Sequence, residues 1–245
     1  MTRKMVCFFT AAALVTCAGL AGALDKPAEK SISDEAELSY VKTGGNTDTE
    51  TLLLKNGLTY RPSATVTGKW KVAVLEGESS GVRTAQRYSS ELRVDKEYTD
   101  RLYTFGNGQW LKDKFMGLDS RYILGGGGGY TIVSTHSHKL LAEAGLSYTW
   151  DDYTDNTSKE YAGGRLYGKY VYALDKKTRF SQWVEWLPDF EETKNYNLNA
   201  ETAVTTSLSD VLSLKVSYLV NYDNVPVAGA EKTDTTFATT LVMNY

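Results

Sequence analysis

The most regular feature of this chain is an alternation of apolar and polar positions with a period of two. At the C-terminal end, Phe237, Leu241, Met243 and Tyr245 lie on one set of alternate positions. Successive side chains of a β-strand point to opposite faces, so this segment predicts a strand with one apolar and one polar face. The same pattern recurs about a dozen times upstream. The chain is therefore expected to be all-β.

The repeated ribbons predict a transmembrane antiparallel up-and-down β-barrel of about 12 strands, because each ribbon reaches the roughly 9–11 residues that a tilted membrane-crossing strand requires. In such barrels short periplasmic turns alternate with longer external loops, and an even strand count leaves both termini periplasmic. We expect short connections near Pro62, Thr99, Thr135, Lys176 and Ser209, and longer ones near Asn46, Ser79, Met116, Asp155, Glu191 and Val227.

The first residues have the organisation of an export signal. Arg3 and Lys4 precede an apolar stretch over residues 5–20, and Ala21-Gly22-Ala23 follows as a small-residue cleavage site. These features predict a signal peptide over residues 1–23. A retained anchor helix is the alternative, although the apolar stretch is short for a membrane span. A lipoprotein acylated at Cys17 is a second alternative, which the Thr16 before it does not favour.

The remainder of the chain divides into two parts. Residues 24–34 are polar and contain Pro27, and they are expected to form an extended periplasmic lead-in. Residues 35–245 are expected to form the barrel. Both cysteines, Cys7 and Cys17, fall within the predicted signal peptide, so the exported chain has no disulfide. The full chain has 30 acidic and 27 basic residues, and this excess of negative charge argues against a nucleic-acid partner.

The polar face of the predicted strands carries charged side chains of both signs. If the apolar face contacts lipid, these side chains face the lumen. A ring that leans basic could line a narrow aqueous path that favours anions. Alternatively, opposite charges could interlock and fill the lumen, and the mixture of signs favours a plugged or very narrow interior. The predicted lumen-facing residues are Lys55, Lys69, Lys71, Arg87, Glu91, Arg93, Arg121, Glu143, Arg165, Lys169, Glu185, Glu201 and Lys215.

Two other classes of protein remain as alternatives. A soluble, secreted, lipocalin-like binding barrel also has alternating strands, but its apolar face points inward. An outer-membrane hydrolase would need a histidine beside a nucleophile or acid. The two histidines, His136 and His138, fall in a predicted periplasmic turn. We therefore predict no catalytic residue, no cofactor and no metal site, and the barrel is expected not to be an enzyme.

Two local patterns have simpler explanations than a ligand site. The five glycines over residues 125–129 lack the Gly-Lys-Ser/Thr ending of a phosphate-binding loop. Glycines within a strand instead indicate close backbone approach, and this run could allow Tyr103, Phe105 or Tyr167 to pack over it. Acidic residues such as Asp151 and Asp152 fall in a predicted polar loop over residues 151–160, where they are expected to be solvated.

The start of the barrel resembles a known family. The segment Ala36-Glu37-Leu38-Ser39-Tyr40-Val41-Lys42-Thr43-Gly44-Gly45-Asn46-Thr47 and the pair Arg121-Tyr122 before the glycine run are similar to uncharacterised proteins known as salt-induced outer membrane proteins. The resemblance implies an outer-membrane barrel of a Gram-negative bacterium. We expect this barrel to be a narrow pore or a structural barrel linked to envelope or osmotic conditions. Phe237, Leu241, Met243 and Tyr245 resemble the signal read by the outer-membrane assembly machinery. The implied partners are that machinery and the outer-membrane lipid bilayer.

Overall fold

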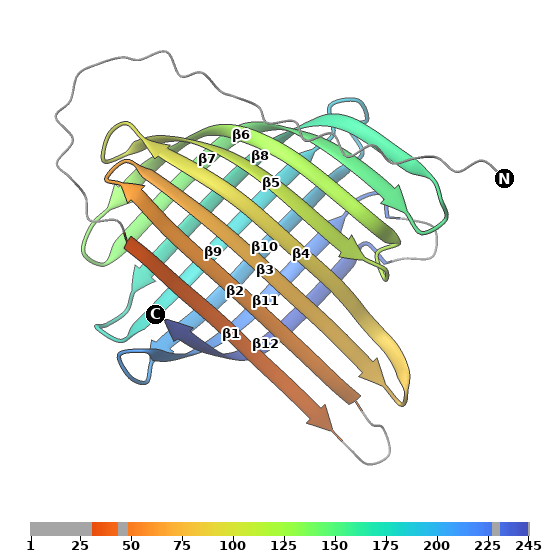
Figure 1. Ribbon diagram of the computed structural model, residues 1–245, viewed down its shortest axis with the longest axis horizontal. Helices are drawn as coiled ribbons and strands as arrows, with labels where there is room; N and C mark the ends of the chain where they lie inside the picture. The colour runs from red at the N-terminus through yellow and green to blue at the C-terminus, as the bar shows by residue number, and fades with distance from the viewer. Residues whose placement is uncertain (1–30, 44–48, 227–230, 245) are drawn as a thin grey trace.

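The computed structural model describes residues 31–43, 49–226 and 231–244. In this part of the chain there is no helix long and apolar enough to cross a membrane. Within these ranges the chain forms twelve strands (Figure 1). They are β1 (Ser31–Thr43), β2 (Thr49–Ser63), β3 (Val66–Ser79), β4 (Val82–Glu97), β5 (Leu102–Asp113), β6 (Leu118–Ser134), β7 (His138–Tyr153), β8 (Ser158–Ala173), β9 (Thr178–Pro188), β10 (Tyr196–Ser207), β11 (Leu212–Asp223) and β12 (Thr233–Asn244).

The strands form one closed sheet. Each strand is antiparallel to its neighbours in sequence, and β1 pairs with β12 to complete the ring. The predicted up-and-down barrel is therefore confirmed. Because Glu35 of β1 pairs with Asn244 of β12, the first strand begins and the last strand ends at the same end of the barrel. We call this the terminal end and the other the opposite end.

The two faces of the sheet differ in polarity. Large apolar side chains project outward and are well exposed, among them Leu92, Leu124 and Leu146, whose exposed fractions are 62–68 %. The charged residues at intervening positions point inward. An exterior of this kind is stable in hydrocarbon rather than in water, so the arrangement does not fit a soluble lipocalin-like barrel. Outward tyrosines and tryptophans, whose polar atoms suit a membrane interface, are Tyr40, Tyr60, Trp70, Tyr98, Tyr122, Tyr130, Tyr148, Trp150, Tyr172, Trp186 and Tyr218.

The seam between β1 and β12 is the shortest ladder in the sheet. Its pairs run from Glu35↔Asn244 to Leu38↔Leu241, whereas β1 and β2 pair from Ser31↔Arg61 to Thr43↔Thr49. The first and last strands are thus joined close to the terminal end.

The structure places the start of the barrel slightly earlier than expected. The predicted lead-in covered residues 24–34, but β1 begins at Ser31 and pairs with β2 from there. The alternation is hidden in this segment because Ser33 and Asp34 put polar side chains on both faces. The predicted signal peptide, residues 1–23, lies outside the described residues.

The predicted long connection near Ser79 is wrong. β3 and β4 continue toward each other and are joined by Ser80 and Gly81 alone. Both residues have positive φ, 50° and 78°, the backbone that matches the twist of a tight hairpin. The connections near Met116 and Asp155 are also short, over residues 114–117 and 154–157. Polar residues at the opposite end therefore extend the strands instead of forming loops.

The glycine run lies in β6 and provides a bare inner surface. Gly129 pairs with Tyr103 on β5 and with Glu143 on β7. A Cβ added at Gly129 would overlap the Tyr103 ring. Because this space is empty, Tyr103 crosses β6 and donates a hydrogen bond from its hydroxyl to Glu143 Oε1 at 2.7 Å.

We predict that Gly129→Ala destabilises the barrel by about 1–3 kcal/mol relative to a neutral glycine substitution, because the new methyl group must displace Tyr103 from Glu143. Gly106→Ala is the matched control, since a Cβ there meets no heavy atom within 4 Å. Urea unfolding in lipid vesicles measures both. Equal stability of the two variants would contradict the account of the glycine run.

Candidate functional site

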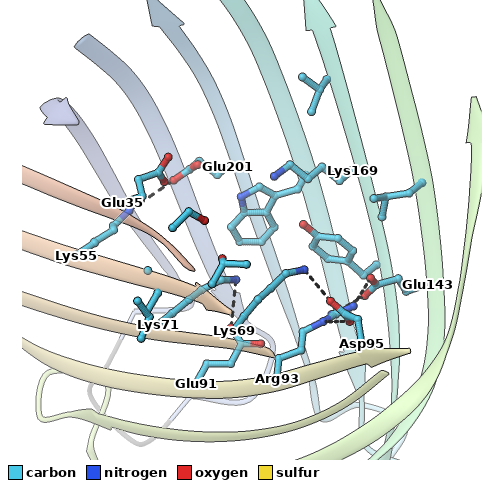
Figure 2. Close-up of a pocket in the computed structure, with 18 of the residues that line it drawn as sticks. Glu35, Lys55, Lys69, Lys71, Glu91, Arg93, Asp95, Glu143, Lys169 and Glu201 are labelled. Atoms are coloured by element: carbon cyan, nitrogen blue, oxygen red, sulfur yellow. Dashed lines mark hydrogen bonds and ion pairs between the residues drawn. The ribbon is translucent and has the colours of Figure 1, made fainter. Parts of the chain in front are cut away.

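The interior of the barrel has a packed half and a hollow half. A cavity of about 1010 Å³ occupies the half toward the terminal end, where Ser33, Thr99 and Asn244 line it. Figure 2 shows charged side chains from several strands that point into this cavity. The half toward the opposite end is filled by inward side chains, among them the buried Arg121 and Asp151.

The structure distributes the thirteen sequence-predicted interior residues between these halves. Arg87 and Arg121 lie in the packed half, and Glu185 lies beside Arg165 at the edge of the hollow half. The ten residues that line the cavity are Lys55, Lys69, Lys71, Glu91, Arg93, Glu143, Arg165, Lys169, Glu201 and Lys215.

Glu143 is the centre of the largest ionic network. Its carboxylate accepts hydrogen bonds from Arg93 Nη2 at 2.7 Å and from Arg165 Nη1 at 2.5 Å. The two guanidinium groups also lie over the ring of Phe105, at 4.4 and 5.3 Å from its centroid. Together with the Tyr103 hydroxyl, these contacts bind one carboxylate to three side chains. Glu143 is consequently buried although it faces the lumen.

The same network continues along the barrel wall on both sides. Arg93 Nε donates to Asp95 Oδ1 at 2.7 Å, and Lys69 Nζ donates to Asp95 Oδ2 at 2.7 Å. On the other side, Arg165 Nε donates to Glu185 Oε1 at 2.6 Å. Cations and carboxylates therefore alternate along the network in equal number. This balance allows charged groups to leave water without an unpaired charge.

A second ionic cluster joins strands near the closing seam. Lys215 lies 3.1 Å from Glu37 and 3.3 Å from Glu201, and Lys55 lies 3.8 and 3.7 Å from the same two carboxylates. The four residues come from β1, β2, β10 and β11, so the cluster spans the short β1–β12 ladder. Two cations and two carboxylates neutralise each other here.

Arg121 crosses the packed half of the lumen. Its Nε and Nη2 donate to the two carboxylate oxygens of Asp151 at 2.6 and 2.7 Å. Its Nη1 donates to Asn197 Oδ1 on β10 at 2.8 Å. Because β7, β8 and β9 separate β6 from β10, this contact connects two walls of the barrel.

Arg87 makes a second connection across the packed half. Its Nη2 lies 3.5 Å from Asn221 Oδ1 on β11, and its Nε lies 3.7 Å from Asp113 on the neighbouring β5. β4 and β11 lie nearly opposite each other in the ring of strands. Arg87 and Arg121 thus place long side chains across the lumen at the end away from the termini.

A folded loop borders this packed half. In residues 189–195, Asp189 accepts hydrogen bonds from the backbone N–H groups of Glu191 and Glu192 and from the side chains of Asn195 and Lys159. Burial alone would raise the pKa of Asp189, but these hydrogen bonds outweigh it and hold the pKa below its ordinary value. The loop is therefore ordered around a charged carboxylate.

Several partners in these clusters were not predicted as site residues. Asp151 was expected in a solvated loop, but it lies in β7 and is buried against Arg121. Asp151 is eight residues after Glu143, so the alternation along β7 places both side chains on the inner face. Extending the strand to residue 151 would have identified it. Asn197 and Asn221 are uncharged, and the sequence contains no signal that pairs them with arginines on distant strands.

His138 differs from its expected position in a turn. It begins β7, and its ring stacks on Tyr172 with centroids 4.7 Å apart. Its Nδ1 also lies 2.8 Å from the Tyr170 hydroxyl. The two tyrosines fix the His138 ring at the terminal end of the barrel wall, away from the ionic networks.

A closed antiparallel sheet with an apolar exterior and an ionic interior defines a barrel of the outer-membrane type. The chain belongs to the DUF481 family, described as proteins of unknown function, which matches residues 36–245. It is 29 % identical over 225 residues to the uncharacterized protein YdiY of Escherichia coli strain K12, covering 91 % of this chain and 86 % of that protein.

Among solved structures, the fold is similar to an outer membrane channel from Pseudomonas putida F1. The TM-score is 0.55, with 8 % identity, and the match covers 93 % of this chain and 100 % of the channel. At this identity the likeness concerns the fold alone. That fold is a closed antiparallel barrel, as the strand pairing of this chain shows.

We predict that Glu143→Gln lowers the free energy of unfolding by about 1–3 kcal/mol, because Arg93 and Arg165 lose the carboxylate they share and keep only Asp95 and Glu185 as ionic partners. Asp119→Asn is the control, since it breaks the Lys112–Asp119 pair at 2.5 Å, in which the Asp119 side chain is 57 % exposed. The control should leave stability within experimental error. Urea unfolding in vesicles compares the two. A Glu143→Gln barrel as stable as the control would contradict a structural role for the network.

Proposed function

We propose that this protein is a non-enzymatic outer-membrane barrel whose lumen is closed near the cell exterior and open toward the periplasm. It is a structural barrel or a very narrow channel, in contrast to an open porin. In this proposal the terminal end faces the periplasm and the packed half lies on the outer side. Both assignments follow the rule that outer-membrane barrels begin and end in the periplasm.

The observation that carries the proposal is the position of Arg121. Its guanidinium group holds Asp151 on β7 and Asn197 on β10 at the same time, and both arginine and aspartate are buried. Ions cannot follow the axis through a buried pair whose hydrogen bonds are satisfied without separating it, and separation costs several kcal/mol. Arg87 adds a second, looser contact across the lumen, at 3.5 Å from Asn221.

The outer-membrane assignment includes the route of assembly. Export by residues 1–23 and recognition of the last strand by the assembly machinery are parts of the proposal. Phe237, Leu241 and Met243 of β12 point outward and are exposed, as side chains read during insertion must be. Tyr245, the last residue of the proposed signal, lies outside the described residues.

The chemistry of the interior supports the non-enzymatic part of the proposal. Catalytic acids and bases need a titratable group that is free to exchange a proton with substrate. Glu143 and Asp151 are instead engaged by arginines, and His138 is stacked on Tyr172. We place the role of the barrel in the cell envelope, where it responds to envelope or osmotic conditions.

The proposal predicts that the wild-type protein conducts little or no current in a planar lipid bilayer. Removing both charges of the buried pair, as Arg121→Ala with Asp151→Ala, should raise single-channel conductance severalfold because the cross-lumen contact is lost without leaving an unpaired charge. Lys112→Ala with Asp119→Ala is the matched control, because it removes an exposed ion pair. Each barrel is first shown to be folded by its faster migration on a gel before heating.

Two results would contradict the proposal. One is a wild-type conductance already as large as that of an open porin. The other is a conductance of the Arg121→Ala, Asp151→Ala barrel that equals that of the wild type and of the control.

A further inference from the structure

Among the described residues, Lys169 has no carboxylate partner, unlike the other predicted interior cations. It lines the cavity, and in the ranges that the structure describes its ammonium group takes part in no ion pair or side-chain hydrogen bond. An unpaired ammonium group can bind an incoming anion without first breaking an existing ion pair. The cations that do have ion-pair partners are Lys55, Lys69, Lys71, Arg87, Arg93, Arg121, Arg165 and Lys215.

The wall around Lys169 is mainly apolar and aromatic. Its cross-strand neighbours are Leu141 on β7 and Trp183 on β9. Tyr167 and Val171 lie two residues away on β8 and share its face. All four line the cavity. Such surroundings contain few groups that compete for the ammonium, so its attraction for an anion is stronger than in bulk water.

The charges near Lys169 are of both signs. Lys71 and Lys215 add positive charge, and Glu201 and Glu35 oppose it. Lys215 is engaged with Glu201, whereas the Lys71 side chain is 60 % exposed and lies 3.4 Å from Glu91. Figure 2 shows the Lys169 side chain extending into the cavity from the wall that faces Lys69 and Lys71. Lys139, two residues before Leu141 on β7, also lines the cavity and adds a further positive charge.

Two aromatic residues, Tyr167 and Trp183, neighbour Lys169 on this wall. The Tyr167 and Trp183 ring centroids are 6.1 Å apart with an interplanar angle of 31°. Within the described part of the chain, the Trp183 Nε1–H has no hydrogen-bond acceptor. A pyranose ring presents an apolar C–H face that can pack on such rings, and its hydroxyl groups can accept from the indole.

We infer that Lys169, Trp183 and Tyr167 form a binding site for a small acidic sugar that enters the cavity from the terminal end. The ammonium binds the carboxylate, and the two rings support the sugar. The cavity of about 1010 Å³ has room for a ligand of this size. This inference deepens the proposed function by naming a ligand class, and it requires only that the cavity be open, so it does not depend on whether the lumen conducts.

The arrangement separates this ligand class from simpler ones. An inorganic anion would use Lys169 but gain nothing from the rings. An uncharged sugar would use the rings but leave the ammonium unpaired. An acidic sugar uses both, and it is therefore expected to bind more tightly than either.

The experiment is a titration of the full-length protein, folded in detergent, with glucuronate, followed by calorimetry and tryptophan fluorescence. Glucose and sulfate are titrated in parallel at matched ionic strength. We expect glucuronate to bind at least about tenfold more tightly than glucose or sulfate. A factor of this size corresponds to the loss of one charge-assisted contact. Lys169→Gln should weaken glucuronate binding by a similar factor, and Lys169→Arg should retain most of it.

The variants Trp183→Leu and Lys112→Gln complete the test. Trp183→Leu should weaken glucuronate binding but leave sulfate binding unchanged. Lys112→Gln removes a lysine charge from β5 outside the cavity and should change nothing. The inference is overturned if glucuronate binds no better than glucose or sulfate, or if folded Lys169→Gln protein binds it with wild-type affinity. Neither outcome bears on bilayer conductance, which tests the proposed function separately.

Discussion

The structure depends on the pairing of opposite charges inside a closed sheet. The exterior is apolar over the strands, so charged side chains at intervening positions can only point inward. There they leave bulk water, which is tolerated when each finds a partner of opposite sign. The clusters around Glu143, around Lys215 and around Arg121 each meet this condition, and they connect strands that are not neighbours in the sheet.

This constraint explains how the interior is divided. Near the opposite end, Arg87 and Arg121 reach across the lumen to asparagines on β11 and β10. Toward the terminal end, the ion pairs lie along the wall and leave a cavity between the walls. Among the described residues that line this cavity, Lys169 has no carboxylate partner. The glycines of β6 serve the same pairing, because the bare surface at Gly129 lets Tyr103 reach Glu143. The same ion pairs therefore determine both how the wall packs and which charges line the lumen.

The sequence predicted the architecture well because side-chain alternation is a local property of a strand. It predicted poorly where both faces of a strand contact water. A long connection was expected near Ser79, but Glu76–Ser79 and Val82–Ala85 extend β3 and β4 to the Ser80-Gly81 turn. The partners of the interior residues were beyond prediction for another reason. The contact between Arg121 and Asn197 depends on the stagger of strands around the ring, and no local pattern encodes that stagger.

The central claim is that apolar side chains face hydrocarbon and charged ones face an enclosed interior. Adjacent positions on β4 test it most directly, since Leu92 is 62 % exposed on the outer face and Glu91 lines the cavity. Spin labels at Leu92→Cys and Glu91→Cys, in barrels reconstituted into vesicles, would be compared for relaxation by oxygen and by a water-soluble nickel complex. The account predicts that oxygen relaxes the label at position 92 and nickel the label at position 91. Nickel access at position 92 together with oxygen access at position 91 would contradict it.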